Sequence, residues 1–301
     1  MTKEDFMIVV LGATGNIGKV IVQELVKNGK KVRAIARNSK RLKELEALGV
    51  EISPGSLEDA AFLKTAFQNA TAVFTMNAPK EQAPNLREYQ KKLSDSIGST
   101  LEKSTVSHIV NLSSVGGELE AGTGPIAGLH YQESRLNQLE RVHILHLRPT
   151  YFMENFLNDI PVIQGMGIHG TPLRADLTMG IIATVDIGMV AAEYLANLNF
   201  TGRSIRYLLG PGDYRMTDVT RILGIAIGKP DLPYVQFSYE DALKGMMQAG
   251  ISEDVAKNYV EMSRALNEGI VKPEPRTAEN TTPTTLEQFA ENVFAPAYKG
   301  A

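Results

Sequence analysis

The chain contains no cysteine and no tryptophan among its 301 residues. Without cysteine it can form no disulfide, no reactive thiolate and no cysteine–zinc site. The five histidines follow none of the spacings typical of metal ligands: His108, His130, His143, His146 and His169. Neither thiol chemistry nor a bound metal is therefore expected.

Long apolar runs and a strong charge of either sign are missing as well. No apolar run approaches the ~20 residues that a membrane-spanning helix needs, and the polar start from Met1 to Asp5 is unlike a signal peptide. The net charge of −3 gives no support to nucleic acid as a partner. We therefore expect a soluble, cytoplasmic protein. Basic side chains outnumber acidic ones only in residues 1–150, which favours an anionic ligand on that half.

What the sequence does contain is a glycine motif near its start. The apolar run 7–11 leads into Gly12-Ala13-Thr14-Gly15-Asn16-Ile17-Gly18. Apolar residues then recur at helical spacing up to Val26, and a second apolar segment, 31–36, follows where a βαβ unit needs it. Such glycines let the backbone turn tightly and approach a pyrophosphate at a helix N-terminus. The motif predicts a dinucleotide-binding domain; the alternative is a glycine-rich turn without a ligand.

The residue after the second predicted strand indicates which dinucleotide binds. A site for NAD usually places an acidic residue there, next to the ribose hydroxyls. This chain has Arg37, within a basic stretch that also contains Lys40 and Arg41. A guanidinium donates two hydrogen bonds to one oxyanion and so suits a 2′-phosphate. The sequence therefore predicts NADP(H), with Arg37 on the phosphate and Arg41 or Lys40 as helpers; the alternative is a solvated basic surface.

The first half alternates apolar strands with amphipathic helices. Strands are predicted at 50–52, 72–76, 108–112 and 142–147, and helices at 39–48 and 84–103, with a further helix carrying Phe62 and Phe67. Strands that are apolar throughout indicate a parallel sheet covered on both faces. The fold class is thus α/β, a Rossmann-type doubly wound parallel sheet, with residues 1–150 as its nucleotide-binding domain.

The second half, residues 151–301, is predicted to be mainly helical. Glycines interrupt 160–172, Asp186 is the expected N-cap of a helix that runs to Leu195, and a strand follows at 204–209. Further helices are predicted at 218–227, 239–248, 253–266 and 286–294. We expect this smaller substrate-side region to cover the carboxyl ends of the strands, with some of its elements returning to the main sheet.

Several of these segments together resemble a known family. They are the glycine motif with Arg37, the turn 55–59, the sequence Leu147-Arg148-Pro149-Thr150-Tyr151-Phe152-Met153-Glu154-Asn155, and the segment 181–188. Over about residues 6–210 the chain resembles the NmrA-like family, atypical members of the short-chain dehydrogenase superfamily. The resemblance implies an NADP-binding Rossmann domain with a small C-terminal domain. It also implies either a reductase of quinones, dyes or phenolic ethers, or a catalytically silent redox sensor with a regulatory protein partner.

The same resemblance assigns cofactor contacts by position. Residues Gly12, Thr14, Gly15, Asn16 and Ile17 would line the pyrophosphate, with Gly18 completing the motif. Arg37 would meet the 2′-phosphate, and Ser56 with Leu57 would border the adenine, although many relatives have an acidic residue at position 56. Asn77 and Ala78 would flank the ribose. Pro149, Tyr151 and Phe152 would pass near the nicotinamide.

The usual catalytic set of the superfamily, Ser–Tyr–Lys, is incomplete here. Ser113 lies at the end of the predicted strand 108–112, and Tyr131 has Arg135 where the lysine would stand. Arginine supplies a positive charge but does not carry protons near neutrality. Three readings stay open: His130 donates a proton, Tyr131 donates it with help from Arg135, or both residues only support the wall of the pocket.

Three functions compatible with the fold follow. The first is an NADPH-dependent oxidoreductase that transfers hydride to a small molecule, a quinone-like or conjugated carbonyl acceptor, since hydride transfer itself needs no protein acid. The second is a non-catalytic NADP(H) sensor that acts through a protein partner. The third, a nucleotide-sugar epimerase, would need the intact Tyr-x-x-x-Lys and a bound NAD, so Arg135 and Arg37 count against it.

Overall fold

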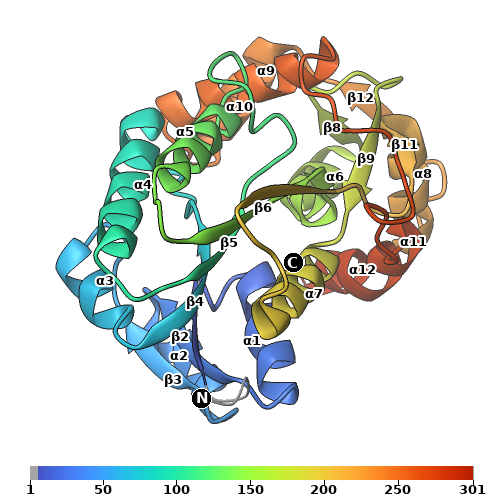
Figure 1. The fold of residues 1–301 in the computed structure, drawn as a ribbon. Coiled ribbons are helices and arrows are strands. Elements are labelled where there is room, and N and C mark those ends of the chain that lie inside the picture. Colours follow the sequence, from blue (N-terminus) through green and yellow to red (C-terminus); the bar gives the residue numbers. More distant parts are fainter. Residues whose placement is uncertain (1–5, 301) are drawn as a thin grey trace.

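A seven-stranded sheet forms the centre of the protein. The computed structural model describes residues 6–300, and Figure 1 shows their course. The strands lie in the order β10-β6-β5-β4-β1-β2-β3, and all neighbours are parallel. Their bounds are Met7–Leu11 (β1), Lys31–Ala36 (β2), Glu51–Pro54 (β3), Ala70–Met76 (β4), His108–Leu112 (β5), His143–Pro149 (β6) and Arg203–Leu208 (β10). The order reverses between β1 and β4, which confirms the predicted doubly wound fold.

Helices cover both faces of this sheet. On one face pack α1 (Asn16–Lys27), α2 (Ser39–Glu46) and α7 (Thr184–Asn197); on the other pack α3 (Ala60–Ala66), α4 (Leu86–Glu102) and α5 (Ile126–Asn137). Side chains alternate along each strand, so Ile8 and Val10 of β1 face α1, whereas Val9 and Leu11 belong to the opposite core. Burial on both faces explains why the strands are apolar throughout.

The second half builds a third hydrophobic core beside the carboxyl ends of the strands. Its short strands are Tyr151–Phe152 (β7), His169–Thr171 (β8), Thr178–Ile182 (β9), Asp213–Arg215 (β11) and Tyr234–Gln236 (β12). Its helices are Met153–Asp159 (η1, 3₁₀), Ile160–Met166 (α6), Met216–Ala226 (α8), Tyr239–Gln248 (α9), Glu253–Asn267 (α10), Leu286–Phe289 (α11), the π-helical turn Ala290–Phe294 (η2) and Ala295–Gly300 (α12). Figure 1 shows α9 and α10 on the α5 side of this region and α11 and α12 near α7.

The predicted helices and strands of the first half match the structure to within a few residues. In the second half the short strands β7, β8, β9, β11 and β12 were not anticipated, because two to five residues per strand leave little periodicity to detect. Two elements of that half, α7 and β10, belong to the main sheet and its cover. A domain boundary at residue 150 stays a prediction.

The predicted start of α7 is wrong. The helix begins at Thr184, and Asp186 lies inside its first turn instead of capping it. The Asp186 carboxylate accepts hydrogen bonds from the backbone N–H (3.0 Å) and the hydroxyl (2.6 Å) of Thr284. A buried carboxylate needs such donors. Asp186 therefore joins α7 to the segment that precedes α11.

Across residues 6–300, no helix combines the length and the apolar character needed to cross a membrane. Residues 1–5, on which the expectation about a signal peptide rests, lie outside the described part of the chain.

Candidate active site

A cavity of about 960 Å³ lies between the sheet and the second half of the chain. The carboxyl ends of four neighbouring strands contribute to it: Leu11 of β1, Met76 of β4, Leu112 of β5 and Pro149 of β6. Its size is at the upper end of the range for ligand pockets, about 300–1,000 Å³. The place is the one at which open α/β sheets bind their ligands.

The glycine motif forms one end of this cavity. Gly12, Gly15, Asn16, Ile17 and Gly18 all line it. Gly12 has a left-handed backbone (φ 66°), and a Cβ added to Gly18 would lie 2.3 Å from the Gly12 carbonyl oxygen, so the loop and α1 approach too closely for larger residues. Within the described chain, the N-terminus of α1 has no side-chain cap and no acidic residue in its first turn. Its backbone N–H groups thus fit a pyrophosphate.

Two basic side chains line the cavity beside the glycine motif. Arg41 donates a hydrogen bond to the Thr14 carbonyl oxygen at 2.8 Å, and Lys80 pairs with Glu58 at 3.2 Å. The Lys80 ammonium also lies 4.7 Å from the ring centre of Tyr89. Sequence reasoning missed Lys80, because nothing in the order of residues places the loop after β4 beside Glu58 in the turn after β3. The residues present therefore fit a phosphorylated dinucleotide.

The other predicted adenosine contacts lie outside the cavity lining. Arg37 is exposed. Burial and the charge of Glu58 raise the pKa of Tyr89, and the positive charge of Arg37 opposes this rise. Arg37 is therefore close enough to Tyr89 to interact with it electrostatically. The Ser56 hydroxyl accepts a hydrogen bond from the Glu58 N–H at 3.2 Å, and Leu57 is buried in the core. Among the described residues, none of Arg37, Ser56, Leu57 and Thr14 borders the cavity itself.

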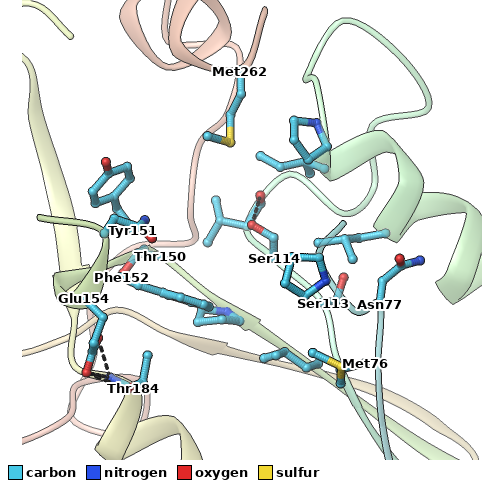
Figure 2. Close-up of a pocket in the computed structure, with 18 of the residues that line it drawn as sticks. Met76, Asn77, Ser113, Ser114, Thr150, Tyr151, Phe152, Glu154, Thr184 and Met262 are labelled. Atoms are coloured by element: carbon cyan, nitrogen blue, oxygen red, sulfur yellow. Dashed lines mark hydrogen bonds between the residues drawn. The ribbon is translucent and has the colours of Figure 1, made fainter. Parts of the chain in front are cut away.

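The middle of the cavity contains the predicted ribose and nicotinamide contacts. Asn77, Ala78, Pro149, Tyr151 and Phe152 all line it. Figure 2 shows Tyr151 and Phe152 on one side and Asn77 with Ser113 and Ser114 across from them. The structure therefore brings the glycine motif, the predicted ribose contacts and the predicted nicotinamide contacts to a single cavity.

Glu154 lines the same cavity and caps α7. Both carboxylate oxygens lie 3.0 Å from the Thr184 N–H, and one accepts the Thr184 hydroxyl at 2.5 Å (Figure 2). Burial raises the pKa of Glu154, while the hydrogen bonds from Thr184 act in the opposite direction. Because both oxygens are occupied by the helix N-terminus, Glu154 acts as an anchor for the turn after β7.

The three predicted catalytic residues are not brought together. Ser113 lines the cavity but is only 2 % exposed, and its hydroxyl donates to Glu133 at 2.5 Å. The Tyr131 hydroxyl donates to Asp95 of α4 at 2.8 Å, and His130 Nδ1 lies 3.0 Å from the Gly117 carbonyl oxygen. In the described residues, α5 lines the cavity with Ile126 and Leu129, and neither His130 nor Tyr131 contributes. A catalytic role for these residues stays a prediction.

Helix α10 contributes to the cavity a stripe of side chains that sequence reasoning did not assign to the site. Val255, Tyr259, Met262 and Leu266 recur at helical spacing and all line the cavity. Figure 2 shows Met262 facing the space between Tyr151 and Ser114. The N-terminus of α10 is held at α4, where Asp254 accepts the Leu86 N–H at 2.7 Å. Burial raises the pKa values of Tyr259 and Tyr151, which keeps both hydroxyls protonated.

The two histidines of β6, His143 and His146, have structural partners. His146 is 2 % exposed, with its ring nitrogens 3.0 Å from Asn111 and 3.1 Å from Asn137. His143 is half-buried and accepts the Gly202 N–H at 3.0 Å. Across residues 6–300, no group of three or more His, Cys, Asp or Glu side chains is arranged to hold a metal ion.

Fold and cavity together define a Rossmann-type protein with a ligand site between its sheet and a smaller second region. More specifically, the chain belongs to the NmrA-like family, whose sequence profile matches residues 4–290. The predicted resemblance to this family is thereby confirmed.

Individual relatives are similar over nearly their whole length. The chain is 25% identical over 297 residues to a NAD(P)H azoreductase of Xenophilus azovorans, covering 98% of this chain and 99% of the relative. Among solved structures, the triphenylmethane reductase of Citrobacter sp. is 18% identical with a TM-score of 0.80, over 97% of this chain and 100% of that one. The NADPH-dependent quinone oxidoreductase of Escherichia coli, solved with NADPH, is 19% identical with a TM-score of 0.81, over 96% and 100%.

Proposed function

We propose that this protein is an NADPH-dependent oxidoreductase that transfers hydride to a quinone-like, azo or other conjugated acceptor. One observation carries the proposal. A single cavity contains a phosphate-binding loop with two flanking cations at one end and an apolar wall of tyrosine, methionine and leucine side chains at the other. The names of the relatives, an azoreductase, a dye reductase and a quinone oxidoreductase, support a reductase over a silent sensor.

The cofactor would lie along the carboxyl ends of β1, β4, β5 and β6. Gly12, Gly15, Asn16 and Ile17 bind the pyrophosphate with backbone N–H groups, and Gly18 lets α1 approach the loop. Arg41 and Lys80, with Arg37 from the rim, bind the 2′-phosphate. Ser56 and Leu57 border the adenine, and Thr14 contributes its backbone to the loop. Asn77 and Ala78 flank the ribose; Pro149, Tyr151 and Phe152 hold the nicotinamide, which supplies a hydride when bound.

The acceptor would lie under α10. Tyr259, Met262 and Leu266 face it from the helix, and Leu177 and Met179 from the region of β9. These side chains exclude water and offer a broad apolar surface, which suits a flat, electron-poor ring system. A simple aldehyde would make few contacts there. The small-molecule substrate class is therefore conjugated and largely apolar.

The test is NADPH oxidation, followed at the nicotinamide absorbance, with naphthoquinones, azo dyes, enones and simple aldehydes. NADPH binding is measured in the same samples by fluorescence. We expect turnover with quinones or azo dyes and little with aldehydes. Tight binding without turnover on any acceptor would favour the sensor, and no NADPH binding would overturn the cofactor assignment as well.

A further inference from the structure

A buried ion pair between Glu133 and Arg148 lies beside Ser113, the cavity residue at which the catalytic set of the superfamily would place its serine. Ser113 Oγ donates to Glu133 Oε1 at 2.5 Å. Glu133 also accepts two hydrogen bonds from Arg148, from Nε to Oε1 at 3.0 Å and from Nη2 to Oε2 at 2.7 Å. Both charged side chains are 6 % exposed. The only hydrogen of the Ser113 hydroxyl is thus committed to a carboxylate inside the protein.

The loop after β5 packs closely against this ion pair, and Arg148 has further hydrogen-bond partners. A Cβ added to Gly117 would lie 2.6 Å from Glu133 Oε1 and 2.8 Å from Ser113 Oγ, so only glycine lets the loop after β5 cover them. Arg148 has two further partners, since Nη1 donates to Glu118 at 2.7 Å and to the Tyr207 hydroxyl at 3.0 Å. The guanidinium is therefore fixed by α5, the loop after β5 and β10 at once.

Backbone hydrogen bonds connect the ion pair to the residues that line the cavity. Arg148 directly precedes Pro149, the first residue of the predicted nicotinamide segment. The Ser113 N–H donates to the Leu147 carbonyl oxygen at 2.8 Å, and the Val115 N–H donates to that of Pro149 at 3.0 Å. A shift of Arg148 would therefore move residues 149–152 relative to the end of β5.

We infer that Glu133 and Arg148 are positioning residues, which hold residues 149–152, the segment proposed to hold the nicotinamide, and withhold the Ser113 proton from the acceptor. This inference rests on the proposed function. The acceptor takes up hydride, which is two electrons and one proton, as the nicotinamide C–H bond breaks, and its anion takes a proton from bulk water once it leaves the site. Such a site suits acceptors whose reduced anion is stabilised by conjugation, as in a hydroquinone anion, and disfavours simple carbonyls, whose alkoxide needs a proton donor.

The first test measures positioning without turnover. Amide hydrogen exchange of Val115 and Thr150, which both donate to backbone carbonyls, is followed in the free protein. We expect about tenfold faster exchange in E133Q and R148M. The matched control is E102Q at the end of α4, which removes the charge that pairs with Arg135 of α5 in a partly exposed ion pair. Unchanged exchange at both amides in E133Q and R148M would overturn the positioning role.

The second test measures turnover with a naphthoquinone. We expect kcat to fall about tenfold in E133Q and R148M, with a change in the NADPH Kd below threefold, because a small misplacement at the reacting end is costly. If either single variant unfolds, the double variant E133L/R148M is used instead. It removes both buried charges together, so its kcat can be compared with that of the wild type. Wild-type kcat in every folded variant would contradict the inference.

The role of Ser113 is tested separately. S113A should lower kcat only about threefold, through a loosened Glu133, and the wild type should show no solvent deuterium isotope effect on kcat/KM for the quinone. A hundredfold loss in S113A with intact NADPH binding would instead make Ser113 the proton donor. If the wild type turns over no acceptor, the proposed function fails, and the hydrogen-exchange test still decides on the positioning role.

Discussion

The two ends of the cavity are built in different ways. At the glycine end, five residues from one turn, 12–18, line the cavity, and the backbone itself provides the binding groups. At the acceptor end, the lining comes from the turn after β6, α5, β9, α10 and the segment 269–273. A site made of backbone depends on glycines, which can be recognised from a short stretch of sequence. A site made of side chains from distant segments depends on tertiary packing, which no short stretch of sequence predicts.

The largest expected effect breaks the glycine end. Gly15→Val places a branched side chain at the N-cap of α1, where the pyrophosphate is proposed to lie, so the NADPH Kd should rise about a thousandfold. The control is Gly165→Ala in α6, where an added Cβ meets nothing within 4 Å. Isothermal titration of both variants provides the measurement. Retained NADPH binding by Gly15→Val would rule out the proposed cofactor position.

Sequence reasoning reached most of the first half because its signals are local. The apolar strands and the glycine turn each depend on a few neighbouring residues, as in the apolar run 7–11 that leads into Gly12. It placed the start of α7 wrongly, because the cap comes from Glu154, 30 residues away. The helix α10 was predicted from its sequence, but nothing in the sequence shows which of its faces covers the cavity.

The Ser113–Glu133 contact was also beyond sequence reasoning. Tyr131 was singled out by its spacing to Arg135, whereas the rotation of α5 against β5 brings Glu133 to the serine. Strand alternation predicts that Asn111 of β5 and Ser113, just after it, point to the same side of the sheet. In the structure Asn111 contacts Gln132 and Ser113 contacts Glu133. Which helix residues lie opposite them is set by tertiary packing.

The second expected effect concerns His146, the buried histidine of β6 that contacts Asn111 and Asn137. Burial lowers the pKa of His146 to about 4, with Glu133 opposing the shift. In the unfolded chain its pKa is near 6.5. Between these values the unfolded state binds more protons, so the free energy of unfolding should fall as the pH drops from 6.5 to 4, by at most about 3 kcal/mol. Above pH 6.5 this contribution is fully present.

Urea unfolding at pH 7.5 and pH 4.5 measures this dependence. His146→Gln should be less stable at pH 7.5 but show a smaller loss between the two values than the wild type. His143→Gln, at the half-buried histidine of the same strand, is the control. An equal pH dependence in the wild type and His146→Gln would mean that His146 does not titrate in this window.

A third, smaller effect sharpens the assignment at the glycine end. Arg41→Ala and Lys80→Ala should each raise the Kd for NADPH about tenfold and that for NADH less than twofold, since a hydrogen bond to a charged group contributes about 1.5 kcal/mol. Arg37→Ala tests whether the exposed arginine at the rim also reaches the 2′-phosphate. Lys43→Ala, in the last turn of α2, is the control. Equal weakening of NADPH and NADH in all three variants would remove the basis for NADP(H) preference.

The smallest effect tests the acceptor end. Met262→Ala removes a flexible apolar side chain that faces the middle of the cavity (Figure 2), so the KM for a naphthoquinone should rise about fivefold, or about 1 kcal/mol. The NADPH Kd should stay within twofold, because Met262 is not among the residues proposed to bind NADPH. Met247→Ala, at a 42 % exposed position in α9, serves as the control. If Met262→Ala weakened the binding of NADPH and of the quinone alike, the two ends would form one coupled site. The division of the cavity into an end made of backbone and an end made of packed side chains would then be wrong.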